Sequence, residues 1–152
     1  MRATQRGLTL IELMIVLAVM AIIAAVGYPL YTNQVQKSRR ADAKIALESV
    51  AMVEERFYTI NGRYTDSFAD LYTGTLAVAA GFDWPCSGAD ECSTSTGNYV
   101  VTIAHEDSEQ DFVATADNDG RQAGDDDCAE FTVNQTGTKT ATDGGSTNCW
   151  GR

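Results

Sequence analysis

The chain is 152 residues long, the size of one ordinary domain with a single compact core. Its formal net charge is −10, and beyond residue 100 eleven acidic residues stand against three basic ones. Such an acidic surface repels nucleic-acid phosphates, so we do not expect the C-terminal half to bind nucleic acid. The one opening for DNA is a basic group further upstream: Lys37, Arg39, Arg40 and Lys44.

Residues 8–31 form an apolar run of 24 residues, which as a helix is about 36 Å long. A bilayer core is about 30 Å thick, so the run predicts a transmembrane helix. No small-residue cleavage site followed by polar sequence ends the run, so we expect it to be retained. The preceding basic residues 1–7 favour a cytoplasmic N-terminus, although Lys37, Arg39 and Arg40 lie just beyond the other end.

Two residues of this run stand out. Glu12 is its only ionisable residue before the tyrosines, and a carboxylate in hydrocarbon is costly, which indicates a functional role. The alternative is an acid near the interface that interacts favourably with the helix dipole, and position alone leaves both open. Pro29 removes a backbone hydrogen bond, so we expect a kink or local melting there.

Residues 32–60 continue the helical pattern without proline or glycine, and Asn61-Gly62 ends it. One long helix from about residue 8 to 59 is therefore predicted. Its second half has one apolar face, which we expect to pack against a globular domain: Ala43, Ala46, Leu47, Val50, Val53 and Phe57.

The remaining sequence predicts a short helix at 67–72 and a polar loop up to residue 97. Runs of β-branched and aromatic residues then predict a small antiparallel meander that covers the apolar face of the helix. Its strands are expected at 98–104, 111–116, 130–134 and 138–141. The predicted fold class is α+β.

Four cysteines in polar sequence indicate disulfides in an oxidising compartment and place the following domain there. Three pairings are possible, and we favour the local ones, Cys86–Cys92 and Cys128–Cys149. Their spacing is not that of a zinc site. Calcium is a weak alternative at Asp117, Asp119 and Asp125, because the run lacks the downstream Glu of an EF-hand loop and also reads as turn sequence.

Catalysis has little support. His105 next to Glu106 and Asp107 lies in a strand-to-strand link, where we expect a solvated side chain, and the sequence has no G-x-S-x-G motif. We therefore expect neither an enzyme nor a cofactor.

The segment from Gly7 to Leu13 resembles the processing site of type IV prepilins and pseudopilins. The resemblance implies that a prepilin peptidase cuts between Gly7 and Leu8, that Leu8 is N-methylated, and that Glu12 pairs with the terminal amine of a neighbouring subunit. Leu8 departs from the usual Phe of the family. Pro29 stands where pilins commonly carry a proline, which implies that the helix can unwind there during assembly.

Later segments extend this resemblance. Residues 57–64 are similar to the helix exit of many pilins, and Cys128 and Cys149 bracket the tail as the C-terminal disulfide loop of pilins does. The pattern Gln122…Asp127-Cys128, with Phe131, Gly137 and Cys149-Trp150, most resembles the minor pilin branch called PilE of type IVa pili. The implied organisation is a leader at 1–7, a transmembrane and filament-core segment at 8–31, and a globular head at 32–152. Within the head, the resemblance implies the second half of the helix at 32–60, an αβ-loop at 61–97, and the sheet and disulfide-bounded region at 98–152.

The predicted function is that of a minor pilin: a structural subunit of a type IV pilus, serving adhesion, twitching motility or DNA uptake. The expected partners are other pilin subunits, the prepilin peptidase and an inner-membrane assembly platform. The head would face the periplasm before assembly and the cell surface afterwards. The alternatives are a pseudopilin of type II secretion, a single-span periplasmic ligand-binding protein and an enzyme.

Overall fold

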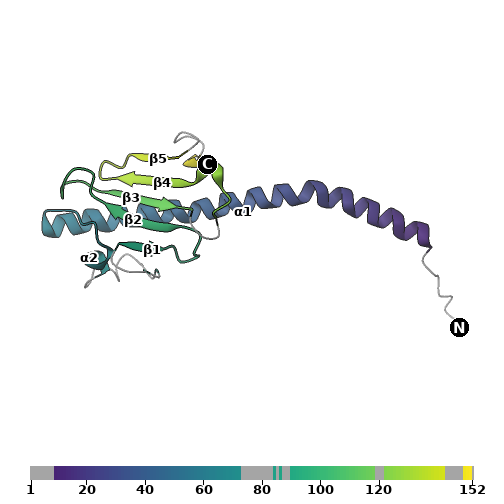
Figure 1. The fold of residues 1–152 in the computed structure, drawn as a ribbon, viewed down its shortest axis with the longest axis horizontal. Helices are drawn as coiled ribbons and strands as arrows, with labels where there is room; N and C mark the ends of the chain where they lie inside the picture. Colours follow the sequence, from purple (N-terminus) through teal and green to yellow (C-terminus); the bar gives the residue numbers. More distant parts are fainter. Residues whose placement is uncertain are drawn as a thin grey trace. The chain divides into compact units, whose positions relative to one another are not determined.

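The computed structural model describes residues 9–72, 84, 86, 90–118, 122–142 and 149–151. The chain divides into two compact units, residues 1–35 and residues 36–152, and we refer to the second as the head. Helix α1, Leu10–Asn61, contributes to both, and the other elements belong to the head (Figure 1). The predicted long helix is confirmed, with its ends two residues further along the chain.

Local interactions fix both ends of α1. At its start the Glu12 backbone N–H donates to the Thr9 hydroxyl at 3.3 Å, the arrangement of a helix N-cap. At its end the Gly62 N–H donates to the Tyr58 carbonyl at 2.7 Å, and Gly62 adopts a φ of 74°. Only glycine takes this left-handed conformation without steric cost, so the helix stops at the predicted place.

Within the first unit, α1 stays helical through Pro29, so the structure shows no melted segment there. Proline at position 29 removes the backbone hydrogen bond to the Ala25 carbonyl and crowds that carbonyl, but the helix continues on both sides of it. The Pro29 carbonyl accepts a separate bond from the Thr32 hydroxyl at 3.0 Å. The predicted unwinding on assembly stays a prediction.

The sheet of the head is an antiparallel meander of five strands in the order β1-β2-β3-β4-β5. Four of them correspond to the predicted strands: β2 at Val100–Ala104, β3 at Val113–Asp117, β4 at Glu130–Asn134 and β5 at Lys139–Ala141. The strand that sequence analysis missed is β1, Glu91–Ser93, which pairs with β2. Its three residues, Glu-Cys-Ser, include no β-branched or aromatic side chain, so the sequence does not predict a strand there. The segment becomes a strand because it pairs with β2.

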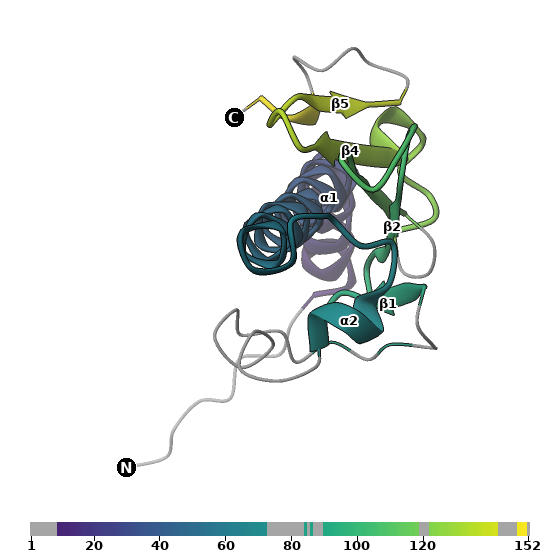
Figure 2. The same ribbon diagram turned by 90° about the vertical axis from the view of Figure 1, so that its left-hand side faces the viewer.

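The second half of α1 lies against one face of this sheet (Figure 2). All six residues of the predicted apolar face are buried. Opposite them, alternate strand residues point inward, among them Val101, Ile103, Ala114 and Ala116. The two alanines lie on β3, in the middle of the sheet, where small side chains let a helix approach closely.

Aromatic side chains complete the core. Tyr99, Phe112 and Phe131 are fully buried, and each contributes about 1.5–3 kcal/mol through the apolar area that it removes from water. The ring of Phe131 packs edge-on against Tyr99 and against Trp150, with centroid distances of 5.9 and 5.6 Å. The head thus has a continuous core between the helix and the sheet, as an α+β fold requires.

Two short elements lie at the margins of this core. Helix α2, Phe68–Tyr72, matches the predicted short helix and buries Phe68 and Leu71. A 3₁₀ turn, Asp126–Cys128, precedes β4 and was not predicted.

Candidate functional site

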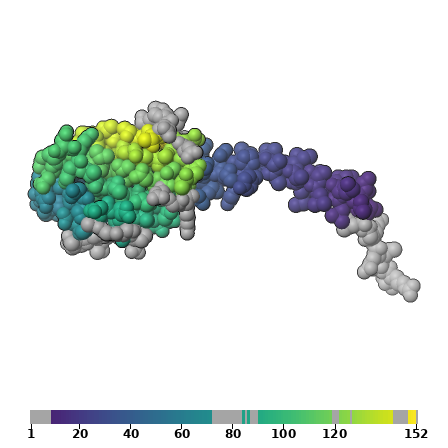
Figure 3. Space-filling view, viewed as in Figure 1, coloured from purple at the N-terminus to yellow at the C-terminus, as the bar shows by residue number. Residues whose placement is uncertain are grey.

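The N-terminal part of α1 exposes its apolar side chains. Leu10, Ile11, Leu13 and Met14 are 53–77% exposed, and the same holds along the helix to Tyr31, which is 70% exposed (Figure 3). In the described part of the chain, this helix alone is long and apolar enough to cross a membrane by length and composition. Exposed side chains of this kind must be covered by lipid or by other protein.

Glu12 lies in the first turn of this apolar segment, with its side chain exposed. It is the only charged residue between positions 9 and 35, so the described part of this unit offers its carboxylate no opposite charge. Its backbone N–H donates to the capping Thr9 hydroxyl, so Glu12 is a helix-start acid. This position is equally compatible with a functional role of its carboxylate. Gly7 and Leu8, the predicted processing residues, lie outside the described residues.

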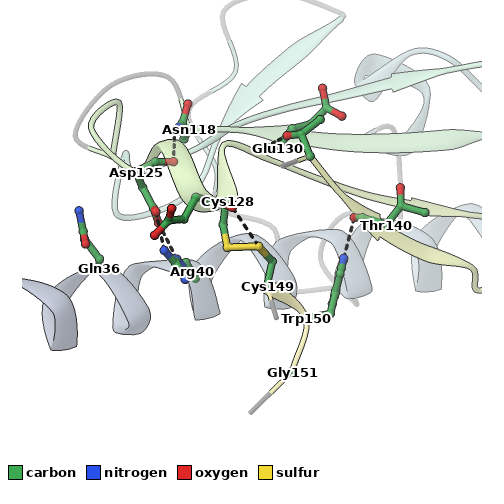
Figure 4. The surroundings of a disulfide bond; sticks show 12 residues. Gln36, Arg40, Asn118, Asp125, Cys128, Glu130, Thr140, Cys149, Trp150 and Gly151 are labelled. Atoms are coloured by element: carbon green, nitrogen blue, oxygen red, sulfur yellow. Dashed lines mark hydrogen bonds and ion pairs between the residues drawn. A yellow bond between two sulfur atoms is a disulfide. The ribbon is translucent and has the colours of Figure 1, made fainter. Parts of the chain in front are cut away.

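Two disulfides close the head. Cys86 is bonded to Cys92 and Cys128 to Cys149, the two pairs that we favoured. The first pair ties residue 86 to strand β1. The second ties the tail to the end of the 3₁₀ turn, next to α1 (Figure 4). Both pairs therefore fasten segments that the sheet alone would hold weakly.

The tail has further contacts beyond its disulfide. The indole N–H of Trp150 donates to the Thr140 carbonyl at 2.7 Å (Figure 4), and the Lys139 ammonium lies 5.0 Å from the centre of the Trp150 ring. Lys139 also pairs with Glu48 of α1 at 2.7 Å. The Lys44 ammonium donates to the Gly151 carbonyl at 3.3 Å. These contacts bring the C-terminal tail, β5 and α1 together.

A buried polar cluster joins α1 to the turn before β4. Arg40 donates to Asp125 through two nitrogens, and Gln122 Nε2 donates to the same carboxylate at 2.8 Å. Gln122 Nε2 also lies 3.4 Å from the backbone carbonyl of Gln36. Burial alone would raise the pKa of Asp125, but the hydrogen bonds from Arg40 and Gln122 outweigh it and hold that pKa below its ordinary range.

This cluster bears on the calcium alternative. Both carboxylate oxygens of Asp125 are bound by Arg40, so Asp125 is not available as a simple cation ligand. Asp117 ends strand β3, and Asp119 lies outside the described residues. Among the residues that the structure describes, no three metal-ligating side chains are grouped closely enough to hold an ion.

His105 has a structural place in the loop between β2 and β3. It is half-buried, where we expected a solvated side chain, and its Nδ1 lies 2.8 Å from the Asp111 carbonyl. The Asp111 carboxylate accepts backbone N–H bonds from Glu106, Asp107 and Ser108. These bonds outweigh the opposing desolvation and lower the pKa of Asp111. The three residues that might have suggested catalysis therefore build a turn.

One buried acid, Glu54, was not predicted from the sequence. Glu54 is 0% exposed and lies on the same face of α1 as Val50, Val53 and Phe57. Its burial could have been predicted from its spacing, because residues three or four positions apart lie side by side on a helix, and Glu54 is four residues after Val50 and three before Phe57.

Comparisons with known proteins agree with this architecture. Residues 29–132 match the family described as type IV minor pilin ComP, DNA uptake sequence receptor, and residues 2–28 match the prokaryotic N-terminal methylation motif. The chain is 29% identical over 118 residues to the type IV major fimbrial protein FimA of Dichelobacter nodosus, covering 76% of this chain and 73% of FimA.

Two further similarities are more partial. The chain is 38% identical over 61 residues to the type IV major pilin protein PilA of Myxococcus xanthus, a match that spans 40% of this chain and only 28% of PilA. A solved type IV pilin from Shewanella oneidensis has a TM-score of 0.48 and 23% identity, covering 77% of this chain and 99% of that one.

The two family matches and the similarity to FimA favour a pilin over the pseudopilin alternative and confirm the predicted minor-pilin character. The predicted pilin fold, a long helix under an antiparallel sheet with a disulfide near the C-terminus, is likewise confirmed. Because the family match covers more than half of its residues, the chain belongs to the type IV minor pilin family and is a structural subunit of a type IV pilus.

Proposed function

We propose that this minor pilin is made as a membrane-anchored precursor and enters the filament through its apolar helix after processing. The leader would be residues 1–7 and the membrane and filament-core segment 8–31. The remaining globular part would be residues 32–152, which begins four residues before the head as the structure divides it. Prepilin peptidase would cut between Gly7 and Leu8, and Leu8 would then be N-methylated. The match to the methylation motif over residues 2–28 supports these steps.

One observation carries the proposal: Glu12 is the only charged residue in an otherwise apolar and exposed stretch of helix. When such helices pack together or lie in lipid, an uncompensated carboxylate is costly. The terminal amine that cleavage creates on a neighbouring subunit would compensate it, because two opposite buried charges offset part of each other's desolvation. Assembly and processing are thereby linked through one ion pair.

The head would face the periplasm before assembly and the cell surface afterwards. Its two disulfides support an oxidising compartment. Other pilin subunits and the inner-membrane assembly platform would be its partners. We propose no catalytic activity for the head, since its only histidine is engaged in a loop and its family is structural.

A test replaces Glu12 by valine in a strain that makes the pilus. The variant should still insert in the membrane. Its amount in sheared filaments should fall at least about tenfold, the ratio that corresponds to a coupling free energy of about 1.4 kcal/mol between Glu12 and the terminal amine. Glu106→Gln, which changes an exposed acid in the β2–β3 loop, is the control and should assemble normally. Normal incorporation of the Glu12→Val chain would refute the proposal.

DNA reception is a second candidate function, favoured by the match to a family described as a DNA uptake sequence receptor. The charge of this chain argues against it. Among the described residues of the head, the exposed cations are few, and Arg63 and Lys139 are already paired with acids. Of the basic group on α1, Lys37 is exposed, and Lys44 is half-buried with its ammonium at the Gly151 carbonyl.

Fluorescence anisotropy with the full chain in detergent and a labelled DNA duplex separates the two possibilities. A DNA receptor should bind at low salt, lose affinity steeply as salt rises, and weaken on Lys37→Glu with Lys44→Glu. Absence of binding at low salt would remove this second candidate and leave the structural function untouched.

A further inference from the structure

Glu54 is an ionisable group that the filament-forming part of the molecule does not use. It lies on α1 within the head, and its side chain is 0% exposed. Glutamate is almost never fully buried unless it is paired with a cation or fully hydrogen-bonded. The surroundings of Glu54 provide neither arrangement among the described residues.

The carboxyl group lies under the chain reversal that joins α1 to α2. Its Oε2 accepts a hydrogen bond from the backbone N–H of Thr65 at 3.3 Å, and its Oε1 has no hydrogen-bond partner within the described part of the chain. Thr65 is itself buried, donates its hydroxyl to Asp70 at 2.9 Å and accepts the N–H of Ser67 at 3.2 Å. Glu54 thus contacts Thr65, whose hydroxyl is hydrogen-bonded to two later residues of the same reversal.

Among the described residues, the charged groups that act on Glu54 are three acids. Glu55 is its neighbour on α1, Asp66 belongs to the reversal and Asp70 lies on α2. Burial raises the pKa of Glu54 to about 7, the Thr65 N–H opposes this, and the three acids add to the rise. Near neutral pH the side chain therefore changes between a neutral form that suits its site and an anion that does not.

We propose that Glu54 makes the reversal a proton-controlled latch: the neutral side chain holds the segment from Gly62 to Tyr72 on α1, and ionisation loosens that segment. A buried anion among acids recruits water, and lifting the reversal is the shortest way to admit it. The rest of the head should stay folded, because the Arg40–Asp125 pair lies fourteen residues earlier on α1, about 21 Å along the helix. This inference does not rest on processing or filament entry.

The direction of the pH effect follows from the sign of the shift. The folded-state pKa of Glu54 lies above the ordinary carboxyl value, so the folded head holds the proton more tightly than the unfolded chain does. The latch should be fully closed below about pH 4.5, weaken as the pH rises toward about 7, and be open above it.

Nuclear magnetic resonance on the full chain in detergent tests the latch. The amide signal of Thr65 should titrate with a midpoint of about 7, and the amides of residues 66–72 should lose about tenfold protection from exchange across it, after correction for intrinsic rates. Glu54→Gln should abolish both effects. Glu48→Gln, an exposed acid on the same helix, should leave both unchanged.

A direct titration guards against a variant that fails to fold. In the unaltered chain, carbon-labelled glutamate should show a carboxyl signal with a midpoint of about 7, and this signal should persist in Glu12→Val. Glutamate midpoints that all lie near the ordinary carboxyl value would overturn the proposal, as would equal loss of protection in Glu54→Gln and the unaltered chain. Filament entry of the Glu12 variant is scored separately, so failure of one proposal is distinguishable from failure of the other.

Discussion

The Arg40 guanidinium donates two hydrogen bonds to the Asp125 carboxylate, from Nε to Oδ2 at 2.6 Å and from Nη2 to Oδ1. The side chain of Asp125 is only 2% exposed, whereas that of Arg40 is 16% exposed. The pair joins residues 85 positions apart in the chain and fastens α1 to the turn that leads into Cys128. Two-pronged pairing of this kind fixes geometry as well as charge.

Loss of Arg40 should therefore destabilise the head. Arg40→Met leaves the buried Asp125 carboxylate without its cation. We expect the free energy of unfolding to fall by about 2–3 kcal/mol, slightly less than the roughly 3–5 kcal/mol of a fully buried pair, because Arg40 is partly exposed. Denaturant unfolding of the full chain in detergent measures it. Arg56→Met, at an exposed position of α1, is the control. A loss no larger than that of the control would contradict this account.

The same pair predicts a loss of stability in acid. The folded-state pKa of Asp125 is depressed, so its contribution is present above the ordinary carboxyl pKa and disappears as the pH falls through the folded value. Melting curves of the unaltered chain should shift downward on this acid side. The shift should be smaller in Asp125→Asn, which has no charge to lose. Equal acid shifts in the two proteins would argue against a structural role for the charge.

The two disulfides should differ in how much each contributes to the free energy of unfolding of the head. Cys128–Cys149 closes a loop with a sequence separation of 21, whereas Cys86–Cys92 closes one of 6. In the chain-entropy view the longer loop stabilises by about 3 kcal/mol and the shorter by about 1 kcal/mol less. Paired serine substitutions, compared by denaturant unfolding, check the order. A larger loss from removing the shorter loop would show that local strain or packing outweighs loop entropy.

Gly62 should tolerate alanine poorly for a backbone reason alone. Its φ is 74°, but a Cβ at this position would meet no atom within 4 Å. Gly62→Ala should therefore lower the free energy of unfolding by about 1 kcal/mol through the left-handed conformation, without a clash. Gly124→Ala has the same open space and no such φ, so it should change stability little. Equal effects of the two substitutions would contradict the assignment.

Much of the fold follows from local sequence patterns. The buried face of α1, strands β2 to β5 and the stop at Gly62 were all predictable, because spacing and turn chemistry determine them within a few residues. Strand β1 was not, since its three residues become a strand only through pairing with β2. The Arg40–Asp125 pair was equally out of reach, because two charged residues far apart in the chain give no sign of meeting.

The candidate site, too, could be predicted from the sequence only in part. Glu12 was recognisable as a lone acid in an apolar run, and the structure adds its place in the first turn of α1. Glu54 escaped notice although its spacing matches Val50, Val53 and Phe57, because acids are normally assigned to the exposed face. Its burial depends on the reversal at Thr65, which no helical pattern describes.

Intact-mass measurement of sheared surface filaments tests the central claim most directly. The account predicts that this chain is present in the filaments, begins at Leu8 and carries the mass of one methyl group on its terminal amine. Filaments that contain the chain with residues 1–7 still attached, or that lack it while the membrane holds it in quantity, would contradict the account.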